Sequence, residues 1–488
     1  MPNYDYDIGV IGGGAGGLTV TAGAAQLGAK TLLVEKENEL GGDCLHFGCV
    51  PSKTLIKSAH VYHLMKNSRK FGLPAMDPPP VDFREISKRI RSVIATIQHH
   101  DSEERFCKLG AQVEFGQPTF TDEHSIRLNG NIYSAKAWVI ATGSCAIVPP
   151  IKGLAETPHI TNKEIFYLDC LPESMVILGG GPIGSEISQA FNRLGTRVSL
   201  VDMAPRILGQ EDPDMADLVR DVLSSEGVKF YLNAAIEEVK DLGSEKEVRL
   251  KTKDGNSISL RAQTILVAVG RAANTKGLGL EDIGLAYNQR GVEVDNRLRT
   301  NHKHIYAAGD VNGGYQFTHA AGYEGGIVVS NAIFRLPRKV DYTFLPWCTY
   351  TDPPLGSIGM NEGRARRAGI DYKVWTEEFK DNDRSLAEGE SIGRIKMILN
   401  EKEKPIGVQI LGPNAGDLLA EWVAVLNGKV KLSTLAAAVH PYPTIAEINK
   451  KVTGTFFSPK IFSTKIQKGL KLFFQLKGRA CPDDVCSE

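Results

Sequence analysis

Apolar runs of strand length recur along the chain, and most of them end at or near a glycine. Parallel strands that are buried on both faces show such continuous apolar runs rather than strict alternation. Stretches of helical period follow two of the glycine-rich turns, at residues 18–27 and 187–194. The order of strand, turn, helix and strand predicts an α/β fold with parallel sheets. The predicted strands are residues 6–11, 31–34, 138–142, 175–178, 197–201, 264–269 and 304–308.

The last third of the chain has a different pattern. The segment at residues 335–345 interrupts the α/β order and predicts a domain boundary. Beyond it, residues 395–399 and 406–411 read as an antiparallel pair, and residues 415–425 as a helix against that sheet. We therefore expect a separate α+β domain at the C-terminal end.

The composition excludes several classes of protein. The 488 residues predict two to four domains, and the 57 basic and 57 acidic residues balance, so nothing indicates nucleic acid as a partner. Eight cysteines in a chain of this length do not indicate a disulfide framework. Neither a signal peptide nor a membrane span is visible, so we expect a cytoplasmic protein, in which a close cysteine pair is more often catalytic than structural.

Cys44 and Cys49 form such a pair, five positions apart in a glycine-rich turn that precedes a run of helical period. A helix N-terminus and the charge of Lys53 both stabilise a thiolate, which is the reactive form of cysteine. Two buried thiols or a structural zinc half-site are the alternatives, but the sequence has no second matching cysteine or histidine pair for zinc. The turn is predicted to hold a redox-active dithiol.

The first glycine-rich turn has the spacing of a dinucleotide-binding site. Gly12, Gly14 and Gly17 lie between a predicted strand and a predicted helix, and Glu35 ends the next strand. The glycines let the backbone approach a pyrophosphate, the helix N-terminus attracts its negative charge, and Glu35 can accept hydrogen bonds from a ribose. A glycine triplet alone is a weak signal, but the strand, helix and acid together predict a nucleotide site.

The pattern occurs again at Gly179, Gly181 and Gly184, with Asp202 at the end of the following strand. Two such sites and a dithiol in one chain predict two cofactors, FAD and NAD(P)H. Asp202 would repel a 2′-phosphate and so favours NADH, although Arg206 is close enough in sequence to weaken this preference.

Further candidate cofactor-binding residues lie where other apolar strands end, because ligands bind at the carboxyl ends of parallel strands. Thr142 and Gly143 end one strand, Gly270 ends another, and Asp310 follows a third. Asp310 could bond the ribityl chain of a flavin or be an ordinary loop carboxylate. Gly42, in the turn before the first cysteine, completes this set.

With these motifs, the chain resembles the pyridine nucleotide–disulfide oxidoreductases, the flavoenzymes that include dihydrolipoamide dehydrogenase, glutathione reductase and mercuric reductase. The resemblance covers about residues 5–455 and implies a homodimer with two Rossmann-like domains, for FAD and NAD(P), and an α+β dimerisation domain. It implies that Cys44 is the interchange thiol, that Cys49 contacts the flavin, and that Lys53 pairs with Glu186 beside it. The implied segments are residues 1–150 and 276–340 for FAD, 151–275 for NAD(P), 341–455 for dimerisation, and 456–488 for a tail.

The segment around Tyr442 departs from the disulfide-reducing members of this family. They carry His-x-His-Pro-Thr followed by an acid, and the second histidine protonates the leaving thiol. Here Tyr442 stands in that position, with His440 two residues earlier and Glu447 at the orienting distance. Tyrosine titrates near pH ~10 and is a poor proton shuttle at neutral pH. His440 either takes over as the acid–base or only packs at a dimer interface.

This departure favours an acceptor that needs no proton donor. Reduction of a soft metal ion held by two thiolates needs none, and mercuric reductases resemble this chain in having tyrosine at that position. The sequence therefore predicts that the acceptor is Hg(II) or a similar soft ion. A disulfide such as a lipoamide or glutathione-like compound, with His440 recruited, is the alternative.

The tail has no counterpart in the family's minimal pattern. Mercuric reductases carry a C-terminal cysteine pair, so the resemblance implies that Cys481 and Cys486 bind a soft cation and pass it inwards; otherwise they are idle thiols. Residues 456–477 interleave apolar residues with lysines and predict a basic amphipathic helix, which either docks on the protein or lies on an anionic membrane surface. Membrane contact would suit electron transfer from NAD(P)H to a quinone, a further alternative.

Overall fold

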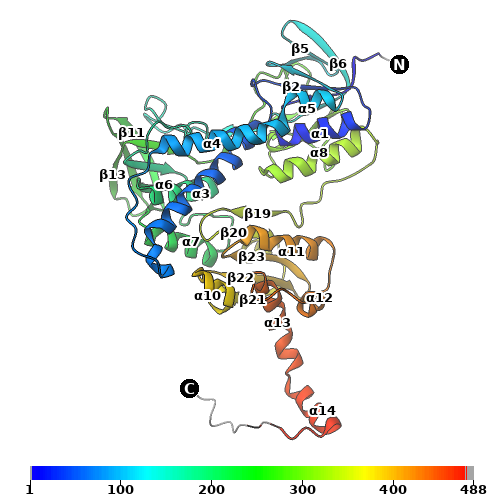
Figure 1. The fold of residues 1–488 in the computed structure, drawn as a ribbon. Helices are drawn as coiled ribbons and strands as arrows, with labels where there is room; N and C mark the ends of the chain where they lie inside the picture. The colour runs from blue at the N-terminus through cyan, green and yellow to red at the C-terminus, as the bar shows by residue number, and fades with distance from the viewer. Residues whose placement is uncertain (1–2, 479, 481–488) are drawn as a thin grey trace. The chain divides into compact units, whose positions relative to one another are not determined.

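The computed structural model describes residues 3–478 and 480, and the chain divides into two compact units. The first comprises residues up to 345 together with 349–352, and the second comprises residues 346–348 and those from 353 onwards. Helices alternate with parallel strands in the first unit and surround an antiparallel sheet in the second (Figure 1), which confirms the predicted fold class. The finer division into five segments stays a prediction.

The first unit contains a largely parallel sheet of order β3-β2-β1-β6-β5-β4, with β18 paired to β6. Helices α1 (Ala15–Gln26) and α8 (Thr318–Ala332) lie side by side (Figure 1). The residues of β1 divide between two core clusters: Ile8 and Val10 enter one, and Tyr6 and Ile11 enter the other. Both faces are therefore covered, which explains the continuous apolar runs. The strands are β1 (Tyr6–Ile11), β2 (Thr31–Glu35), β3 (Ala111–Phe115), β4 (Thr119–Asp122), β5 (Ser125–Leu128), β6 (Asn131–Ile140) and β18 (Ile305–Ala307).

The segment between β2 and β3 is helical and carries the redox turn. Asp82 caps the longest amphipathic helix of this segment by accepting a hydrogen bond from the backbone N–H of Arg84, and Phe83, Ile90 and Ile94 form its buried face. The helices are α2 (Gly42–His46), α3 (Cys49–Lys66), α4 (Phe83–Gln98) and α5 (Glu103–Lys108), with single turns η1 (Ser68–Phe71) and η2 (His99–Asp101).

A second parallel sheet, of order β10-β9-β8-β14, follows in the same unit. Proline occupies the first turn of both α6 and α7. A backbone N–H in the first turn has no partner within the helix, so proline costs no helical hydrogen bond there. The elements are β8 (Ser174–Leu178), α6 (Pro182–Leu194), β9 (Arg197–Val201), α7 (Pro213–Ser225), β10 (Lys229–Tyr231), the antiparallel strands β11 (Ala234–Asp241), β12 (Lys246–Thr252) and β13 (Ser257–Ala262), and β14 (Thr264–Val267). Short pairs join β7 (Ser144–Ala146) to β15 (Arg271–Ala273) and β16 (Tyr287–Asn288) to β17 (Gly291–Val292).

The second unit has a five-stranded sheet of order β19-β20-β23-β22-β21, with α11 against β20 and β23 and α13 against β21 and β22. Trp422 of α11 is fully buried and donates to Oδ1 of Asn449 in α13 at 2.8 Å. The elements are β19 (Pro346–Thr349), β20 (Leu355–Gly359), α9 (Glu362–Arg367), β21 (Tyr372–Glu378), η4 (Phe379–Asp381), α10 (Asp383–Glu388), β22 (Arg394–Asn400), β23 (Pro405–Leu411), α11 (Ala415–Asn427), α12 (Leu432–Ala437), α13 (Glu447–Ile461) and α14 (Thr464–Phe474).

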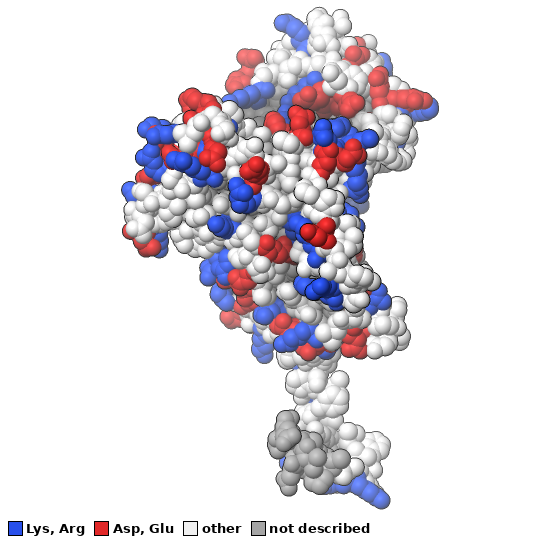
Figure 2. Space-filling model, turned by 60° about the vertical axis from the view of Figure 1, so that its left-hand side comes forward, with Lys and Arg blue, Asp and Glu red and all other residues white. Residues whose placement is uncertain are grey.

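The prediction of one helix over residues 456–477 is wrong. Residues up to 461 belong to α13, and α14 begins separately at Thr464. Pro459 lacks an N–H and weakens the end of α13, and Ser463 takes an extended conformation (φ −64°, ψ 148°) before α14. No helix of the described residues is both long and apolar enough to span a membrane. Basic and acidic side chains are interspersed over most of the face seen in Figure 2.

Candidate active site

The two cysteines of the redox turn belong to consecutive helices. Cys44 lies in α2, and Cys49 is the first residue of α3, so its sulfur is at the positive end of that helix. Both are free thiols, and they are hydrogen-bonded to each other. Sγ of Cys49 also lies 3.4 Å from Oγ1 of Thr318, the first residue of α8.

These contacts divide the protons of the pair unequally. The hydrogen bond from Cys44 lowers the pKa of Cys49 to about 6, and Thr318 and the charge of Lys53 act in the same direction, against burial and Glu186. The same hydrogen bond and burial raise the pKa of Cys44 well above its usual range. At neutral pH the reduced pair therefore holds a thiolate on Cys49 and the remaining proton on Cys44.

Lys53 lies one helical turn after Cys49 and pairs with a carboxylate of α6. Its Nζ is 2.7 Å from Oε2 of Glu186, and Oε1 of Glu186 accepts a 2.8 Å hydrogen bond from the backbone N–H of Tyr350. The ammonium also lies 4.4 Å from the centroid of the Tyr350 ring. Because Glu186 is only 5% exposed, its charge depends on these two partners. The structure thus brings the predicted pair, Lys53 and Glu186, together beside the dithiol.

The three glycines of the first glycine-rich motif serve different purposes: Gly12 and Gly14 lie between β1 and α1, and Gly17 lies in the first turn of α1. Gly12 has a φ of 110°, and a Cβ on Gly17 would lie 1.8 Å from the carbonyl oxygen of Gly12, so the fold itself requires both. Gly14 has a φ of −87°, and a Cβ there would lie 3.8 Å from its nearest neighbour. The chain's own packing does not require glycine at Gly14. The open space at this helix N-terminus fits the pyrophosphate of FAD.

Glu35 and Gly42 flank the same space. Glu35 is 7% exposed and accepts hydrogen bonds from the backbone N–H groups of Gly13, at 2.6 Å, and Glu37, at 2.9 Å. Its oxygens keep lone pairs for a ribose hydroxyl. Gly42 has a φ of 61°, and a Cβ on it would lie 2.7 Å from Cα of Gly14, so the redox turn passes directly against the first glycine turn.

Asp310 begins the single turn η3 (Asp310–Asn312) after β18. Burial raises its pKa, opposed by a 2.5 Å hydrogen bond from Oγ of Ser144 and by the charge of Arg271. Arg271 donates to Ser144 at 2.7 Å and pairs with Asp43 of the redox turn at 3.1 Å. This network holds the Asp310 carboxyl near the redox turn, where it can accept a hydrogen bond from the ribityl chain of a flavin.

Thr142, Gly143 and Gly270 line neighbouring strand ends. Thr142 donates from Oγ1 to the carbonyl of Asn274 at 2.7 Å, and the Asn274 amide donates back to the carbonyl of Thr142 at 2.9 Å. Gly143 and Gly270 have φ values of 67° and 149°, and a Cβ on Gly143 would meet no described atom within 4 Å. As at Gly14, this free space suits the close approach of a bound nucleotide.

The second glycine turn repeats the geometry of the first. Gly179 has a φ of 108°, and a Cβ on Gly184 would lie 1.9 Å from the carbonyl oxygen of Gly179. A Cβ on Gly181 would meet no described atom within 4 Å, and Gly181 precedes the first residue of α6 with an ordinary φ of −71°. The space at Gly181 therefore fits the pyrophosphate of NAD(P)H.

The acid of the second turn is held as Glu35 is. Asp202 accepts hydrogen bonds from the backbone N–H groups of Gly180, at 2.6 Å, and Ala204, at 2.7 Å. Nε of Arg206 donates to Asp217 of α7 at 3.2 Å, so this cation is engaged with a carboxylate. The preference for NADH over NADPH stays a prediction.

Tyr442 and Glu447 belong to the second unit. Tyr442 is 71% exposed, and its hydroxyl donates to Oδ2 of Asp383 at 2.8 Å, which raises the pKa of the phenol. Glu447 accepts a 3.3 Å hydrogen bond from the backbone N–H of Thr444 at the start of α13. Glu447, the acid predicted to orient Tyr442, thus bonds the backbone at the start of its own helix. Among the described residues, the carboxylate that accepts a hydrogen bond from Tyr442 is Asp383.

His440 is turned towards the core of the second unit. Its side chain is 10% exposed, and Nε2 lies 3.0 Å from Oε1 of Glu421 in α11. The other oxygen of Glu421 accepts a 2.9 Å hydrogen bond from Asn449. A role for His440 as an acid–base stays a prediction. Cys481 and Cys486 lie outside the described residues, and their role in metal transfer stays a prediction as well.

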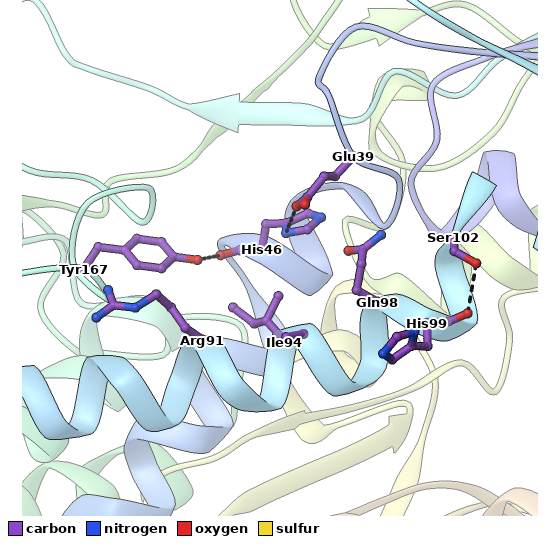
Figure 3. Close-up of a pocket in the computed structure, with 9 residues that line it drawn as sticks. Glu39, His46, Arg91, Ile94, Gln98, His99, Ser102 and Tyr167 are labelled. Atoms are coloured by element: carbon purple, nitrogen blue, oxygen red, sulfur yellow. Dashed lines mark hydrogen bonds and ion pairs between the residues drawn. The ribbon is translucent and has the colours of Figure 1, made fainter. Parts of the chain in front are cut away.

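A pocket of about 480 Å³ lies behind the redox turn, between α4, α2 and the loop after β2 (Figure 3). Nε2 of His46 lies 2.9 Å from the carbonyl oxygen of Leu40, and the amide of Gln98 donates to the same oxygen at 3.0 Å. The hydroxyl of Tyr167 donates to the carbonyl of His46 at 2.7 Å. These contacts brace the short helix that carries Cys44.

Several residues of the site give little signal in the sequence. Thr318, Ser144 and Arg271 are ordinary polar residues in sequence, and they reach the redox turn or Asp310 only through the fold. Glu324 is fully buried in α8, accepts 2.7 Å hydrogen bonds from the backbone N–H of Gly309 and the Asn312 amide, and so fixes the turn before Asp310. Burial raises the pKa of Glu324. Glu324 is the one acidic residue of this glycine-rich helix, and that is the signal that could have found it.

Comparisons with known proteins agree with this geometry. The family described as pyridine nucleotide-disulphide oxidoreductase matches residues 6–325, and its dimerisation domain matches residues 345–452. Mercuric reductase from Bacillus cereus is 31% identical over 456 residues, which cover 93% of this chain and 72% of that protein. Dihydrolipoyl dehydrogenase from Geobacillus stearothermophilus is 35% identical over 447 residues, covering 90% of this chain and 93% of that protein.

A solved structure is similar over nearly the same span. The Cu(II) complex of the HOCl-induced flavoprotein disulfide reductase RclA from Escherichia coli has a TM-score of 0.82 at 27% identity. It covers 93% of this chain and 100% of the other.

Proposed function

The chain belongs to the pyridine nucleotide-disulphide oxidoreductase family, which uses FAD and NAD(P)H, and from this premise we propose that its dithiol reduces Hg(II) or a similar soft metal ion. Bound FAD supplies a two-electron carrier between the nicotinamide and the sulfur pair. In the balanced reaction, NAD(P)H and Hg(II) give NAD(P)⁺, a proton and Hg(0).

The dithiol has the chemistry that a soft cation requires. Soft thiolate ligands select soft metal ions, and ligands must lose their protons to bind. The pKa of Cys49, lowered to about 6, makes this sulfur a ligand at neutral pH, and Cys44 releases its proton when the metal ion binds. Lys53, held by Glu186, keeps a positive charge near these sulfurs and so favours the anionic form of the pair.

One observation carries the choice of acceptor. Where the disulfide-reducing members of the family hold an imidazole, this chain has Tyr442, whose pKa is raised further by Asp383. The nearby imidazole of His440 is buried against Glu421. A group that holds its proton this firmly does not shuttle it at neutral pH, which supports an acceptor that takes electrons without needing a proton for a leaving thiol.

The test is an acceptor screen on the FAD-loaded enzyme with NADH and with NADPH. The acceptors are Hg(II) in excess thiol, Cu(II), lipoamide, glutathione disulfide and a soluble quinone. Cu(II) is included because the similar RclA structure is a Cu(II) complex. We expect metal-dependent oxidation of the nicotinamide by the native enzyme, and little turnover of the two disulfides.

The matched variants are Tyr442→Phe and Tyr442→His. Tyr442→His should raise disulfide reduction by on the order of tenfold or more, because an imidazole titrates near neutral pH. Tyr442→Phe should leave disulfide reduction as low as in the native enzyme. Brisk lipoamide reduction by the native enzyme without metal turnover would overturn the proposal.

Two other functions remain as alternatives. The 35% identity to a dihydrolipoyl dehydrogenase supports a lipoamide-type disulfide as the second candidate acceptor. Quinone reduction is the third, and activity with a quinone that survives Cys44→Ser would favour it. We also propose that the enzyme is a cytoplasmic homodimer; the match of the dimerisation domain to residues 345–452 supports the dimer, and the location rests on the sequence alone.

A further inference from the structure

The last described helix, α14, lies beyond the region that the family domains match, which ends at residue 452. None of the residues of α14 is buried. Figure 1 shows it after the far end of α13, away from the five-stranded sheet of its own unit. Since α13 packs on β21 and β22, the second unit is complete without α14, and this helix is available for a partner outside the unit.

The side chains of α14 separate into two faces. Positions i, i+4, i+7 and i+8 lie on one face of a helix, and here they hold only large apolar residues. All four are exposed to solvent: Ile466 by 44%, Leu470 by 40%, Phe473 by 80% and Phe474 by 71%. The opposite face carries the basic residues Lys465, Lys468 and Lys471, together with one exposed apolar residue, Leu472.

Between residue 448 and the acidic residues Asp483, Asp484 and Glu488 of the tail, the charged side chains are all basic. No aspartate or glutamate occurs between residues 448 and 482, although the whole chain has equal numbers of basic and acidic residues. The basic residues of this stretch are Lys450, Lys451, Lys460, Lys465, Lys468, Lys471, Lys477 and Arg479. Around α14, Figure 2 shows blue and white surface without red.

We propose that α14 binds the enzyme to the surface of a membrane that contains anionic phospholipid. The apolar face of Ile466, Leu470, Phe473 and Phe474 would lie at the boundary between headgroups and acyl chains, and the lysines would contact the phosphates. The helix is too short to span a bilayer and lies along the surface.

Other occupants fit the two faces less well. If α14 paired with α14 of a second copy, the apolar stripe would be covered, but the lysines of the opposite face would have no anionic partner. Nucleic acid would neutralise the lysines but would leave the two phenylalanines in water. An anionic bilayer satisfies both faces at once.

The test is cosedimentation of the full-length, FAD-loaded enzyme with vesicles. One set contains phosphatidylglycerol and phosphatidylcholine, and the other contains phosphatidylcholine alone. We expect binding to the anionic vesicles that falls at high salt, and much weaker binding to the neutral ones, because each lysine near an anionic surface contributes roughly fivefold to affinity.

Two variants separate the contributions of the two faces. Replacing Lys465, Lys468 and Lys471 together by glutamine should weaken binding to anionic vesicles by on the order of 100-fold. Changing Phe473→Gln and Phe474→Gln should weaken it at every salt concentration, because the apolar contact is lost. The control variant carries glutamine at Lys380, Lys402 and Lys404, three exposed lysines of the same unit, and should bind as the native enzyme does. NAD(P)H oxidation without vesicles should be equal in all of them, which checks folding.

Three results would overturn the proposal. The first is equal binding to neutral and anionic vesicles, and the second is an equal loss in the control variant. The third is an enzyme that does not bind vesicles but uses α14 for another partner. That partner would be a second copy if the two phenylalanine changes abolish self-association, and nucleic acid if the lysine changes abolish its retention. The vesicle result does not depend on which acceptor the dithiol reduces.

Discussion

Replacing Cys44 by alanine should raise the pKa of Cys49. The hydrogen bond from Cys44 is the largest influence that lowers this pKa to about 6. A hydrogen bond to a charged group contributes roughly 1.5–3 kcal/mol, and one pKa unit corresponds to about 1.4 kcal/mol. The pKa of Cys49 should therefore rise by about 1–2 units in Cys44→Ala. Cys44→Ser keeps a hydroxyl donor at the same place, and its shift should be smaller.

The assay is the pH dependence of alkylation of Cys49 by iodoacetamide in the reduced, FAD-loaded protein. Modification is followed by the mass of the peptide that contains residue 49, because Cys107, Cys145 and Cys170 are exposed thiols that also react. A single rate at pH 7 would mislead. The thiolate fraction falls as the pKa rises, but intrinsic nucleophilicity grows with a Brønsted slope of about 0.4–0.5 and offsets much of the loss. The midpoint of the profile is the quantity to compare.

Two outcomes would refute this reasoning. If the midpoint stays near 6 in Cys44→Ala, the hydrogen bond is not the main cause, and Thr318, the charge of Lys53 and the helix N-terminus must account for the low value. If Cys44→Ser shifts the midpoint as far as Cys44→Ala, the donor at this position does not matter. Lys53→Met serves as the comparison, since Lys53 lowers the same pKa through its charge alone.

Three further predictions follow from the cofactor turns and from a buried ion network. Gly184→Ala should lower the thermal midpoint of unfolding, because its Cβ would lie 1.9 Å from the carbonyl oxygen of Gly179. Gly181→Ala should keep that midpoint and raise the KM for NAD(P)H by on the order of tenfold. An unchanged KM would contradict the assignment of Gly181 to the nucleotide site. The ratio of kcat/KM values should favour NADH and should fall in Asp202→Ala, and a native preference for NADPH would show this to be wrong. Burial alone would raise the pKa of Asp352, but the hydrogen bonds and ion pairs with His60 and Arg193 hold this pKa below its ordinary range. The stability that ionised Asp352 contributes is therefore present above the pKa of the unfolded chain, ~3.9, and is lost as the pH falls through the pKa of the folded state. Asp352→Asn should lower the free energy of unfolding at pH 7 by about 2 kcal/mol and flatten its dependence on pH below ~4, as measured with urea, and an acid profile equal to that of the native protein would contradict this.

The parts of the site that could be predicted from sequence are those whose signal is local. The segment from Gly12 to Gly17 follows β1 and runs into α1, and the segment from Gly179 to Gly184 follows β8 and runs into α6 in the same way. The spacing of Cys44, Cys49 and Lys53 likewise follows from one turn and the start of one helix. In such segments the order of residues fixes the geometry, because a helix and its preceding turn form from near neighbours.

The parts that were missed depend on contacts between distant segments. Thr318 reaches Cys49 across 269 positions, and Arg271 connects the redox turn with the end of β18, so no spacing in the sequence reveals them. The helix predicted over residues 456–477 failed for a local reason. Its alternation of lysines and apolar residues continues through Pro459 and Ser463. Proline cannot donate a helical hydrogen bond, and Ser463 is extended, so a separate helix begins at Thr464.

The position of Glu186 ties the redox helix to the second parallel sheet. One oxygen of this carboxylate holds Lys53, and the other takes the amide of Tyr350, so three segments that are far apart in the chain meet at a single side chain. Separation of α3 from α6 would break the ion pair with Lys53 and leave the buried Glu186 carboxylate with the Tyr350 amide alone. We therefore expect the start of α3, the N-terminal turns of α6 and the backbone at Tyr350 to move together, so that Lys53 keeps a fixed place beside the two sulfurs.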